Sequence, residues 1–177
     1  MFFERLLALT LMVFCTPVWI LTFIITKCTS SGPFLFKQKR LGKNKKPFAL
    51  YKIRTMKVGA EKLQKKYQKL NEADGPVFKI RNDPRFTPFG KWLSHTGLDE
   101  LPQLINIVKG EMSFIGPRPL PVSEAIKIPT KYAPRFSVLP GITSPWVVEG
   151  SHQLSFKDWM ELDLWYAKNK NIKVKCR

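Results

Sequence analysis

A long apolar segment interrupted by a proline most constrains what this chain can fold into. The segment runs from Leu6 to Thr26, between Arg5 and Lys27. About 20 apolar residues suffice to cross a bilayer as a helix. The segment is apolar on every side, which argues against the buried helix of a soluble domain. It is also too long for a cleaved signal peptide and precedes no small-residue cleavage site. We therefore predict a membrane-anchoring segment.

Pro17 lies near the centre of this segment. A proline removes one backbone hydrogen bond and clashes with the preceding turn, so it kinks a helix. The hydroxyl of Thr16 could donate to a carbonyl of that turn. Two geometries follow: a kinked single span, or a re-entrant helix that returns to the same face. The residues alone leave both open. The basic chain after Lys27 favours the cytoplasmic side.

The overall charge predicts an anionic partner. The 177 residues include 30 Lys and Arg against 13 Asp and Glu, a formal net charge of +17. Such a surface suits nucleic acid, anionic lipid headgroups or phosphorylated substrates. We find no nucleic-acid motif in the sequence, and the apolar segment favours lipid phosphate, so we expect no nucleic-acid partner. The three cysteines have no metal-ligand spacing, which fits a reducing compartment.

The remaining pattern predicts an α+β fold that is mainly α-helical. Residues 32–56 read as a short β-hairpin with a cationic turn at 41–46, which either rests on headgroups or is solvated. A charged helix is expected over 61–70. The apolar residues Phe89, Trp92 and Leu93 predict an amphipathic helix, either interfacial or in the core. We expect two parts, an anchor over 1–28 and a compact domain over 29–177.

Asp99 and Glu100 open an amphipathic run over 98–110. Apolar residues recur there at helical spacing, and Pro102 places the first helical turn at about 99–102. Both carboxylates are then expected at a helix N-terminus, where the macrodipole favours anions and free N–H groups can hold a phosphate. Simple helix capping is the alternative explanation for such an acidic pair.

Other charged side chains are candidates for a site, although the pattern around Lys52 and Arg54 is also common in half-exposed strands. Lys52 and Arg54 alternate with apolar neighbours on a predicted strand, which places them on one face. Arg118 lies between two prolines that fix the backbone on both sides of it, as suits a guanidinium held for a phosphate or a carboxylate; an exposed arginine in a turn is the alternative. Asp163 is a third candidate carboxylate. Thr143 belongs to a rigid turn over 139–143.

Five ordered motifs together resemble a known family. They are Tyr51-Lys52-Ile53-Arg54-Thr55-Met56, Leu98-Asp99-Glu100-Leu101-Pro102-Gln103-Leu104 followed by Asn106, the stretch 109–119, Pro140-Gly141-Ile142-Thr143, and the stretch 161–166. The chain is similar in these motifs to the bacterial sugar transferases, the monotopic polyprenyl-phosphate phosphoglycosyl transferases, in a small form limited to the catalytic domain. The resemblance implies a re-entrant membrane helix broken at Pro17, with amphipathic helices at the interface.

The resemblance also implies a reaction and a set of residues. The Asp99 carboxylate is expected to attack the β-phosphate of a UDP-sugar and release UMP, and polyprenyl (undecaprenyl) phosphate then takes the sugar-phosphate. Mg²⁺ is expected as cofactor, with Glu100 and Asp99 as its ligands. We expect Lys52, Arg54 and Arg118 to bind substrate phosphate, with Asp163 and Thr143 in support.

By the same resemblance, the setting is the cytoplasmic face of a bacterial inner membrane, in contact with lipid headgroups, at the initiating step of glycan assembly. Self-association is left open.

The sequence departs from the family pattern at three positions. Ser94 stands where an arginine is common five residues before the dyad aspartate, Ser151 replaces a second arginine, and Val147 replaces a glutamine. These departures suggest a different sugar or weaker substrate binding. They also support an alternative function, a catalytically weak homologue that binds lipid phosphate or acts as a scaffold in glycan assembly.

Overall fold

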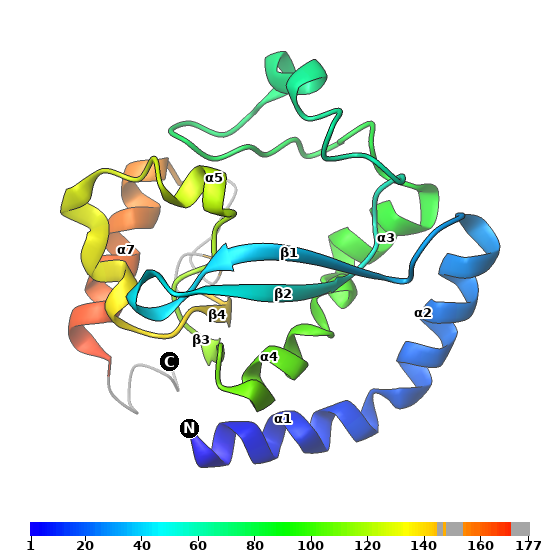
Figure 1. Cartoon of the computed structure of the whole chain (residues 1–177), viewed down its shortest axis with the longest axis horizontal. Helices are drawn as coiled ribbons and strands as arrows, with labels where there is room; N and C mark the ends of the chain where they lie inside the picture. The colour runs from blue at the N-terminus through cyan, green and yellow to red at the C-terminus, as the bar shows by residue number, and fades with distance from the viewer. Residues whose placement is uncertain (145–146, 148–153, 171–177) are drawn as a thin grey trace.

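The computed structural model describes residues 1–144, 147 and 154–170. The fold is α+β and mainly helical, as predicted (Figure 1). In chain order, with η for a 3₁₀ helix, the elements are α1 (Phe2–Phe14), α2 (Thr16–Thr29), β1 (Leu35–Leu41), η1 (Lys43–Lys45), β2 (Pro47–Ile53), η2 (Lys65–Leu70), α3 (Pro88–Thr96), η3 (Leu98–Glu100), α4 (Gln103–Lys109), β3 (Ser113–Ile115), α5 (Val122–Ala125), η4 (Thr130–Ser137), β4 (Gly141–Thr143) and α7 (Phe156–Asn169).

The apolar N-terminal segment forms two helices that meet at an angle. Helices α1 and α2 are bent by 57° at a break that contains Cys15. Pro17 lies in the first turn of α2, so the break falls two residues before the proline and not at it. The reason is that a missing N–H costs least in the first turn of a helix. The Thr16 hydroxyl donates to the Met12 carbonyl at 3.2 Å, across the break.

Two small sheets organise the rest of the chain. Strands β1 and β2 form the predicted antiparallel hairpin, with Leu35 opposite Ile53 and Leu41 opposite Pro47. Strands β3 and β4 form a short parallel pair, in which Ser113 lies opposite Gly141. Between the sheets, the charged helix expected over 61–70 forms only as turns followed by the 3₁₀ helix η2.

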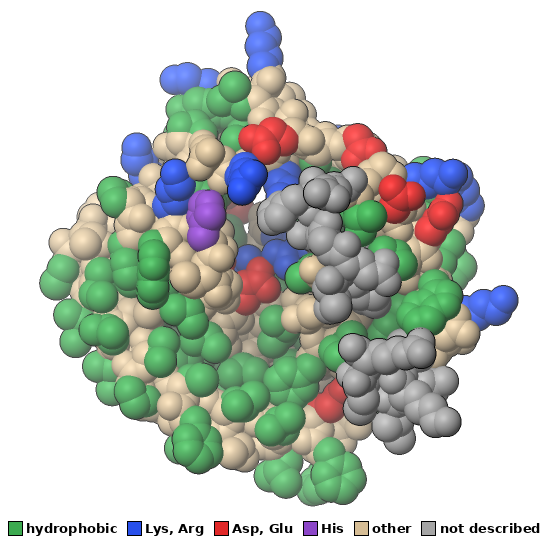
Figure 2. Space-filling model, turned by 180° about the vertical axis from the view of Figure 1, so that it is seen from behind, with side chains coloured by type: hydrophobic (Ala, Val, Ile, Leu, Met, Phe, Trp, Pro, Cys, Tyr) green, Lys and Arg blue, Asp and Glu red, His purple; other side chains and the backbone are tan. Residues whose placement is uncertain are grey.

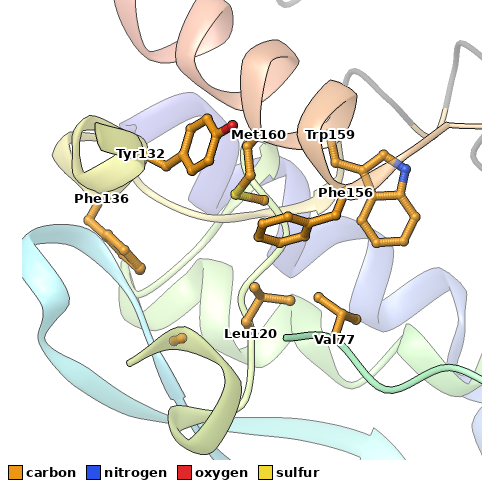
Figure 3. Packing of buried hydrophobic residues seen from close by; sticks show 8 residues of the cluster. Val77, Leu120, Tyr132, Phe136, Phe156, Trp159 and Met160 are labelled. Carbon is orange, nitrogen blue, oxygen red and sulfur yellow. The ribbon is translucent and has the colours of Figure 1, made fainter. Parts of the chain in front are cut away.

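Two apolar clusters hold these elements together. The first joins α7 and η4 to the loops before α3 and α5, through buried side chains that Figure 3 shows in contact: Val77, Leu120, Tyr132, Phe136, Phe156, Trp159 and Met160. The second joins α1 to β2 and α4, through Ala8, Leu50, Leu104, Ile107 and Met112. Helix α1 therefore packs directly on the helix that follows the acidic pair (Figure 1).

The side chain of Asn106 connects α4 to the free edge of the hairpin. Asn106 is fully buried, and its amide oxygen accepts from the Tyr51 N–H at 3.2 Å. Its amide nitrogen donates to the Ala49 carbonyl and to Glu111 Oε2, both at 2.7 Å. The amide thus occupies the place that the next strand of a sheet would take, and it satisfies backbone groups that would otherwise be buried without partners.

We expect Asn106→Ala to lower the free energy of unfolding by about 3 kcal/mol, because buried backbone groups of β2 lose their partners. Asn169→Ala is the matched control, since the Asn169 amide donates to the Trp165 carbonyl at an exposed position; its effect should stay within about 0.5 kcal/mol. Chemical unfolding in detergent measures both values. Equal stability of the two variants would contradict the role assigned to Asn106.

Candidate active site

The acidic pair lies in a tight turn between two helices. Helix α3 ends at Gly97, whose φ of 73° reverses the chain, and η3 then carries Asp99 and Glu100. Helix α4 begins only at Gln103, with Pro102 as its N-cap. The prediction that both carboxylates occupy the first turn of the helix is therefore wrong by one turn. Pro102 has no N–H to donate to an α-helical bond across the pair, and the residue before a proline is disfavoured in α conformation.

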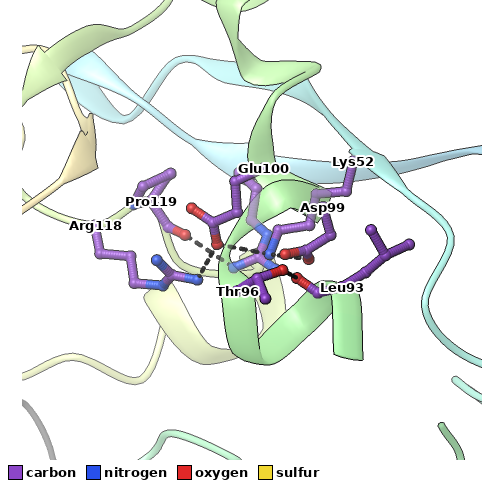
Figure 4. Close-up of polar contacts among 8 residues, drawn as sticks. Lys52, Leu93, Thr96, Asp99, Glu100, Arg118 and Pro119 are labelled. Atoms are coloured by element: carbon purple, nitrogen blue, oxygen red, sulfur yellow. Dashed lines mark hydrogen bonds and ion pairs between the residues drawn. The ribbon is translucent and has the colours of Figure 1, made fainter. Parts of the chain in front are cut away.

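Two cations from distant parts of the chain hold the acidic pair. Lys52 Nζ lies 2.8 Å from Glu100 Oε1 and 3.3 Å from Asp99 Oδ2. Arg118 Nη2 approaches the same Glu100 oxygen at 2.7 Å. Figure 4 shows Glu100 between Arg118 and Lys52, with Asp99 beside Lys52. The structure thus brings two of the three predicted phosphate ligands, Lys52 and Arg118, to the acidic pair; their binding of phosphate stays a prediction.

The same arrangement separates the acidities of the two carboxyl groups. Burial raises the pKa of Asp99, and Lys52 opposes that rise only in part. The pKa of Glu100 falls well below its usual range, because Arg118 and Lys52 together outweigh the desolvation that burial imposes. The arrangement thus favours the ionised form of Glu100 between its two cations, and the Asp99 carboxyl keeps its proton to a higher pH than an exposed aspartate does.

The backbone around Arg118 is held by its carbonyl groups. The Pro117 carbonyl accepts from the Gly141 N–H at 3.1 Å, and the Arg118 carbonyl accepts from Arg135 Nη2 at 2.9 Å. The Pro119 carbonyl accepts from Arg40 Nη1 at 2.8 Å. The two prolines have no N–H, so carbonyl bonds are the main way to fix this stretch. Three consecutive bonds set the direction from which Arg118 reaches Glu100.

Asp163 acts on this stretch through a buried arginine. Arg135 Nε and Nη2 lie 2.9 and 2.7 Å from Asp163 Oδ2, and both side chains are almost completely buried. The same Nη2 donates to the Arg118 carbonyl. Asp163 therefore holds Arg135, which in turn holds the backbone of Arg118, the partner of Glu100. Its role is to orient these cations. Breaking such a pair leaves a buried charge uncompensated.

A pocket of about 570 Å³ opens beside Glu100. Its wall includes Thr143 at the end of β4, together with Ser94 and Val147, two positions where the sequence departs from the family pattern. Asp163 also lines it, whereas Asp99 is 4% exposed and is not part of the pocket wall. Figure 2 shows a hollow with charged side chains on this side of the molecule. Ser151 lies outside the described residues.

Arg54 is the candidate phosphate ligand that the structure places elsewhere. Its guanidinium donates to the Pro33 carbonyl at 2.6 Å and to the side chain and carbonyl of Ser30. Arg54 thus secures the turn between α2 and β1. Lys52 is the last but one residue of β2 and Arg54 follows the strand, so strict alternation no longer keeps the two side chains on one face.

Three cations of the pocket were missed by the sequence analysis: Arg40, Lys79 and Arg135. Arg40 lies on β1 and Lys79 in the loop before α3, and neither belongs to a motif that signals phosphate binding. The hairpin register could have identified Arg40, because it shares a sheet face with Lys52. Arg135 is 28 residues from Asp163 in the chain, a separation that no local pattern reveals.

The acidic pair offers two carboxylate oxygens that could contribute to a Mg²⁺ site. Asp99 Oδ1 and Glu100 Oε2 accept no hydrogen bond from any described residue. No cluster of three or more His, Cys, Asp and Glu side chains suited to a metal occurs in the described part of the chain. Mg²⁺ commonly takes one or two carboxylates and completes its shell with waters and substrate phosphates. The pair therefore suits a metal ion that arrives with a phosphate substrate.

Comparison with known proteins gives the family. The model of the family described as "Bacterial sugar transferase" matches residues 1–177, so the chain belongs to this family. It is 39% identical over 142 residues to the galactosyl transferase CpsE of Streptococcus agalactiae, covering 80% of this chain and 32% of that protein. It is 35% identical over 184 residues to the uncharacterized sugar transferase EpsL of Bacillus subtilis, covering 99% and 85%.

A third relative is named for its lipid substrate. The chain is 31% identical over 176 residues to the undecaprenyl-phosphate galactose phosphotransferase of Salmonella typhimurium, covering 94% of this chain and 36% of that protein. The chain thus spans about a third of the length of the streptococcal and Salmonella proteins. The resemblance stated from the motifs is confirmed at the level of the family.

Proposed function

We propose that this protein transfers a sugar-1-phosphate from a UDP-sugar to polyprenyl phosphate, through a covalent intermediate on Asp99. The observation that carries the proposal is the pairing of two adjacent, largely buried carboxylates with Lys52 and Arg118 beside a cationic pocket. A structural capping pair needs no pocket and no converging cations. The name of the Salmonella relative, a phosphotransferase for undecaprenyl phosphate, supports the choice of substrates.

In the first step, a carboxylate oxygen of Asp99 bonds to the β-phosphorus of the UDP-sugar. The bond from that phosphorus to the bridging oxygen breaks, and UMP leaves with the bridging oxygen. In the second step, an oxygen of polyprenyl phosphate attacks the same phosphorus, which releases the Asp99 carboxylate and forms a polyprenyl-diphosphate sugar. A covalent intermediate lets two unlike substrates use one site in turn.

The charged residues of the site have different electrostatic roles in this reaction. Attack by a carboxylate on a diphosphate meets charge repulsion, which Lys52 and Arg118 offset. Glu100 keeps both cations in place, because its low pKa leaves it ionised. A Mg²⁺ ion held by Glu100 and Asp99 would neutralise phosphate charge when bound. Since Asp99 is buried and is not part of the pocket wall, its carboxylate must become accessible from the pocket for attack.

We also propose that α1 and α2 form a re-entrant anchor in a bacterial inner membrane, with the catalytic part on the cytoplasmic face. Neither helix alone is long and apolar enough to cross, and among the described residues the bent pair satisfies length and composition only together. Helices of 13 and 14 residues measure about 20 Å, short of a hydrocarbon core of about 30 Å. Figure 2 shows an apolar surface over these helices, to which exposed side chains of both contribute: Phe2, Phe3, Leu6, Leu7, Leu9, Val13, Phe14, Ile20, Leu21, Phe23 and Ile24.

The activity is tested by UMP release. Purified protein given Mg²⁺, polyprenyl phosphate and a panel of UDP-sugars should release UMP with at least one sugar, and Asp99→Asn should lower the rate by at least about 1000-fold, because a carboxamide is a poor nucleophile. Asp158→Asn is the control, since Asp158 caps α7 outside the pocket. Wild-type protein that binds lipid phosphate but releases no UMP would instead favour the weak homologue or scaffold.

The raised pKa of Asp99 predicts the acid limb of the pH profile. Asp99 attacks only when ionised, so kcat/KM should fall as the pH drops through a pKa above the ordinary 3.8. Lys52 lowers that pKa, and Lys52→Met should therefore move the limb to higher pH, whereas Lys52→Arg should largely keep it in place. Rates at saturating Mg²⁺ measure both. A limb that stays fixed in Lys52→Met would refute the coupling.

The topology is tested with single cysteines placed at Phe2 and at Lys168 in a chain whose own cysteines are changed to serine. A membrane-impermeant thiol reagent should label both positions only after the cells are permeabilised, because a re-entrant pair returns the chain to the face it left. Labelling of position 2 alone on intact cells would demonstrate a full crossing.

A further inference from the structure

We infer that Lys79 forms a second phosphate subsite, which holds the nucleotide phosphate that departs in the first step. This inference rests on the proposed function and names a residue that the acidic pair does not touch. Lys79 lines the same pocket as Glu100 and Arg118. It lies in the loop between η2 and α3, on the wall formed with α7.

The backbone of Lys79 is fixed from three sides. Its N–H donates to Asn71 Oδ1 at 2.7 Å, and its carbonyl accepts from the Glu72 N–H at 2.8 Å. Two residues earlier, Val77 is buried in the first apolar cluster, and its carbonyl accepts from the Asn71 amide. Such a loop presents its side chain without first having to be ordered, which is the condition for a preorganised ligand.

The ammonium group of Lys79 is placed where it could bind an anion. Lys79 Nζ lies 5.8 Å from the centre of the Trp159 ring, a cation–π distance, and the side chain is half-buried. Among the described residues, no carboxylate lies within ion-pair distance of Lys79. The same holds for Arg40, which also lines the pocket. Burial and the nearby Arg118 and Arg81 lower the pKa of Lys79, and Glu72 opposes them only in part.

The position favours the nucleotide over the lipid phosphate. The residues around Lys79, such as Val77 and Trp159, belong to the first apolar cluster, and α1 and α2 contribute no residue to that cluster in the described chain. The lipid acceptor would approach from the membrane helices, which contact α3 and α4. When the bond to the bridging oxygen breaks, that oxygen becomes a terminal oxygen of UMP and gains negative charge. A lysine at this place would stabilise the charge as it develops.

The test compares UDP, UMP and uridine as probes for the full chain in detergent, by calorimetry. Lys79→Met should weaken UDP binding about tenfold and leave uridine binding unchanged, and Lys79→Arg should stay within about threefold of the wild type, since it keeps the charge. Lys91→Met controls for the loss of one positive charge, because Lys91 is exposed and lies outside the pocket wall. Melting temperatures of all variants separate a binding effect from misfolding.

Kinetics with the productive UDP-sugar complete the test. The KM for the UDP-sugar should rise in Lys79→Met while the KM for polyprenyl phosphate stays constant. Equal UDP affinity in Lys79→Met and Lys91→Met overturns the subsite, and so does a rise confined to the KM for polyprenyl phosphate. Wild-type protein that binds UDP through Lys79 yet releases no UMP overturns the transfer reaction and leaves the phosphate subsite standing.

Discussion

The buried acidic pair is the constraint on which the rest of this structure depends. Asp99 and Glu100 are neighbours in the chain and both largely withdrawn from water. Two such carboxylates cannot both stay ionised unless cations are brought close to them. The chain offers no cation next to the pair, so Lys52 comes from β2 and Arg118 from the loop after β3. Much of the fold beyond α1 and α2 serves to place these two side chains.

Lys52 and Arg118 are held in place by different sets of hydrogen bonds. On the Lys52 side, the Asn106 amide fastens the strand to α4, the helix that directly follows the pair. On the Arg118 side, carbonyl bonds from Arg40, Arg135 and Gly141 hold a proline-bounded stretch. Neither set uses a residue of the acidic pair. The frame of the site can therefore stay fixed while its ligands change, as the proposed two-step reaction requires.

Much of this could be read from the sequence, because local patterns determine it. The hairpin follows from alternating residues around a turn, and the broken apolar segment follows from Pro17. Lys52, Arg118 and the acidic pair lie in motifs that are contiguous in the chain. Other features could not be predicted, because they depend on packing between segments that are distant in the chain. They are the ion pair of Arg135 with Asp163, the position of Arg54, and the place of Lys79 in the pocket wall. The helix start was misplaced by one turn because Pro102 could be assigned to the first helical turn or to the cap before it.

The packing of α1 on α4 has a consequence for where the reaction takes place. Helix α4 has seven residues, so it is only about 10 Å long. One end follows the acidic pair, and its buried face carries the contact with Ala8. In the proposed membrane arrangement, the packing of α4 on α1 sets the distance between Asp99, the proposed nucleophile, and the acyl chains. The charged phosphate of a lipid acceptor would also stay at the membrane surface, because its burial among acyl chains is costly, so the proposed arrangement limits the depth at which the two groups can meet.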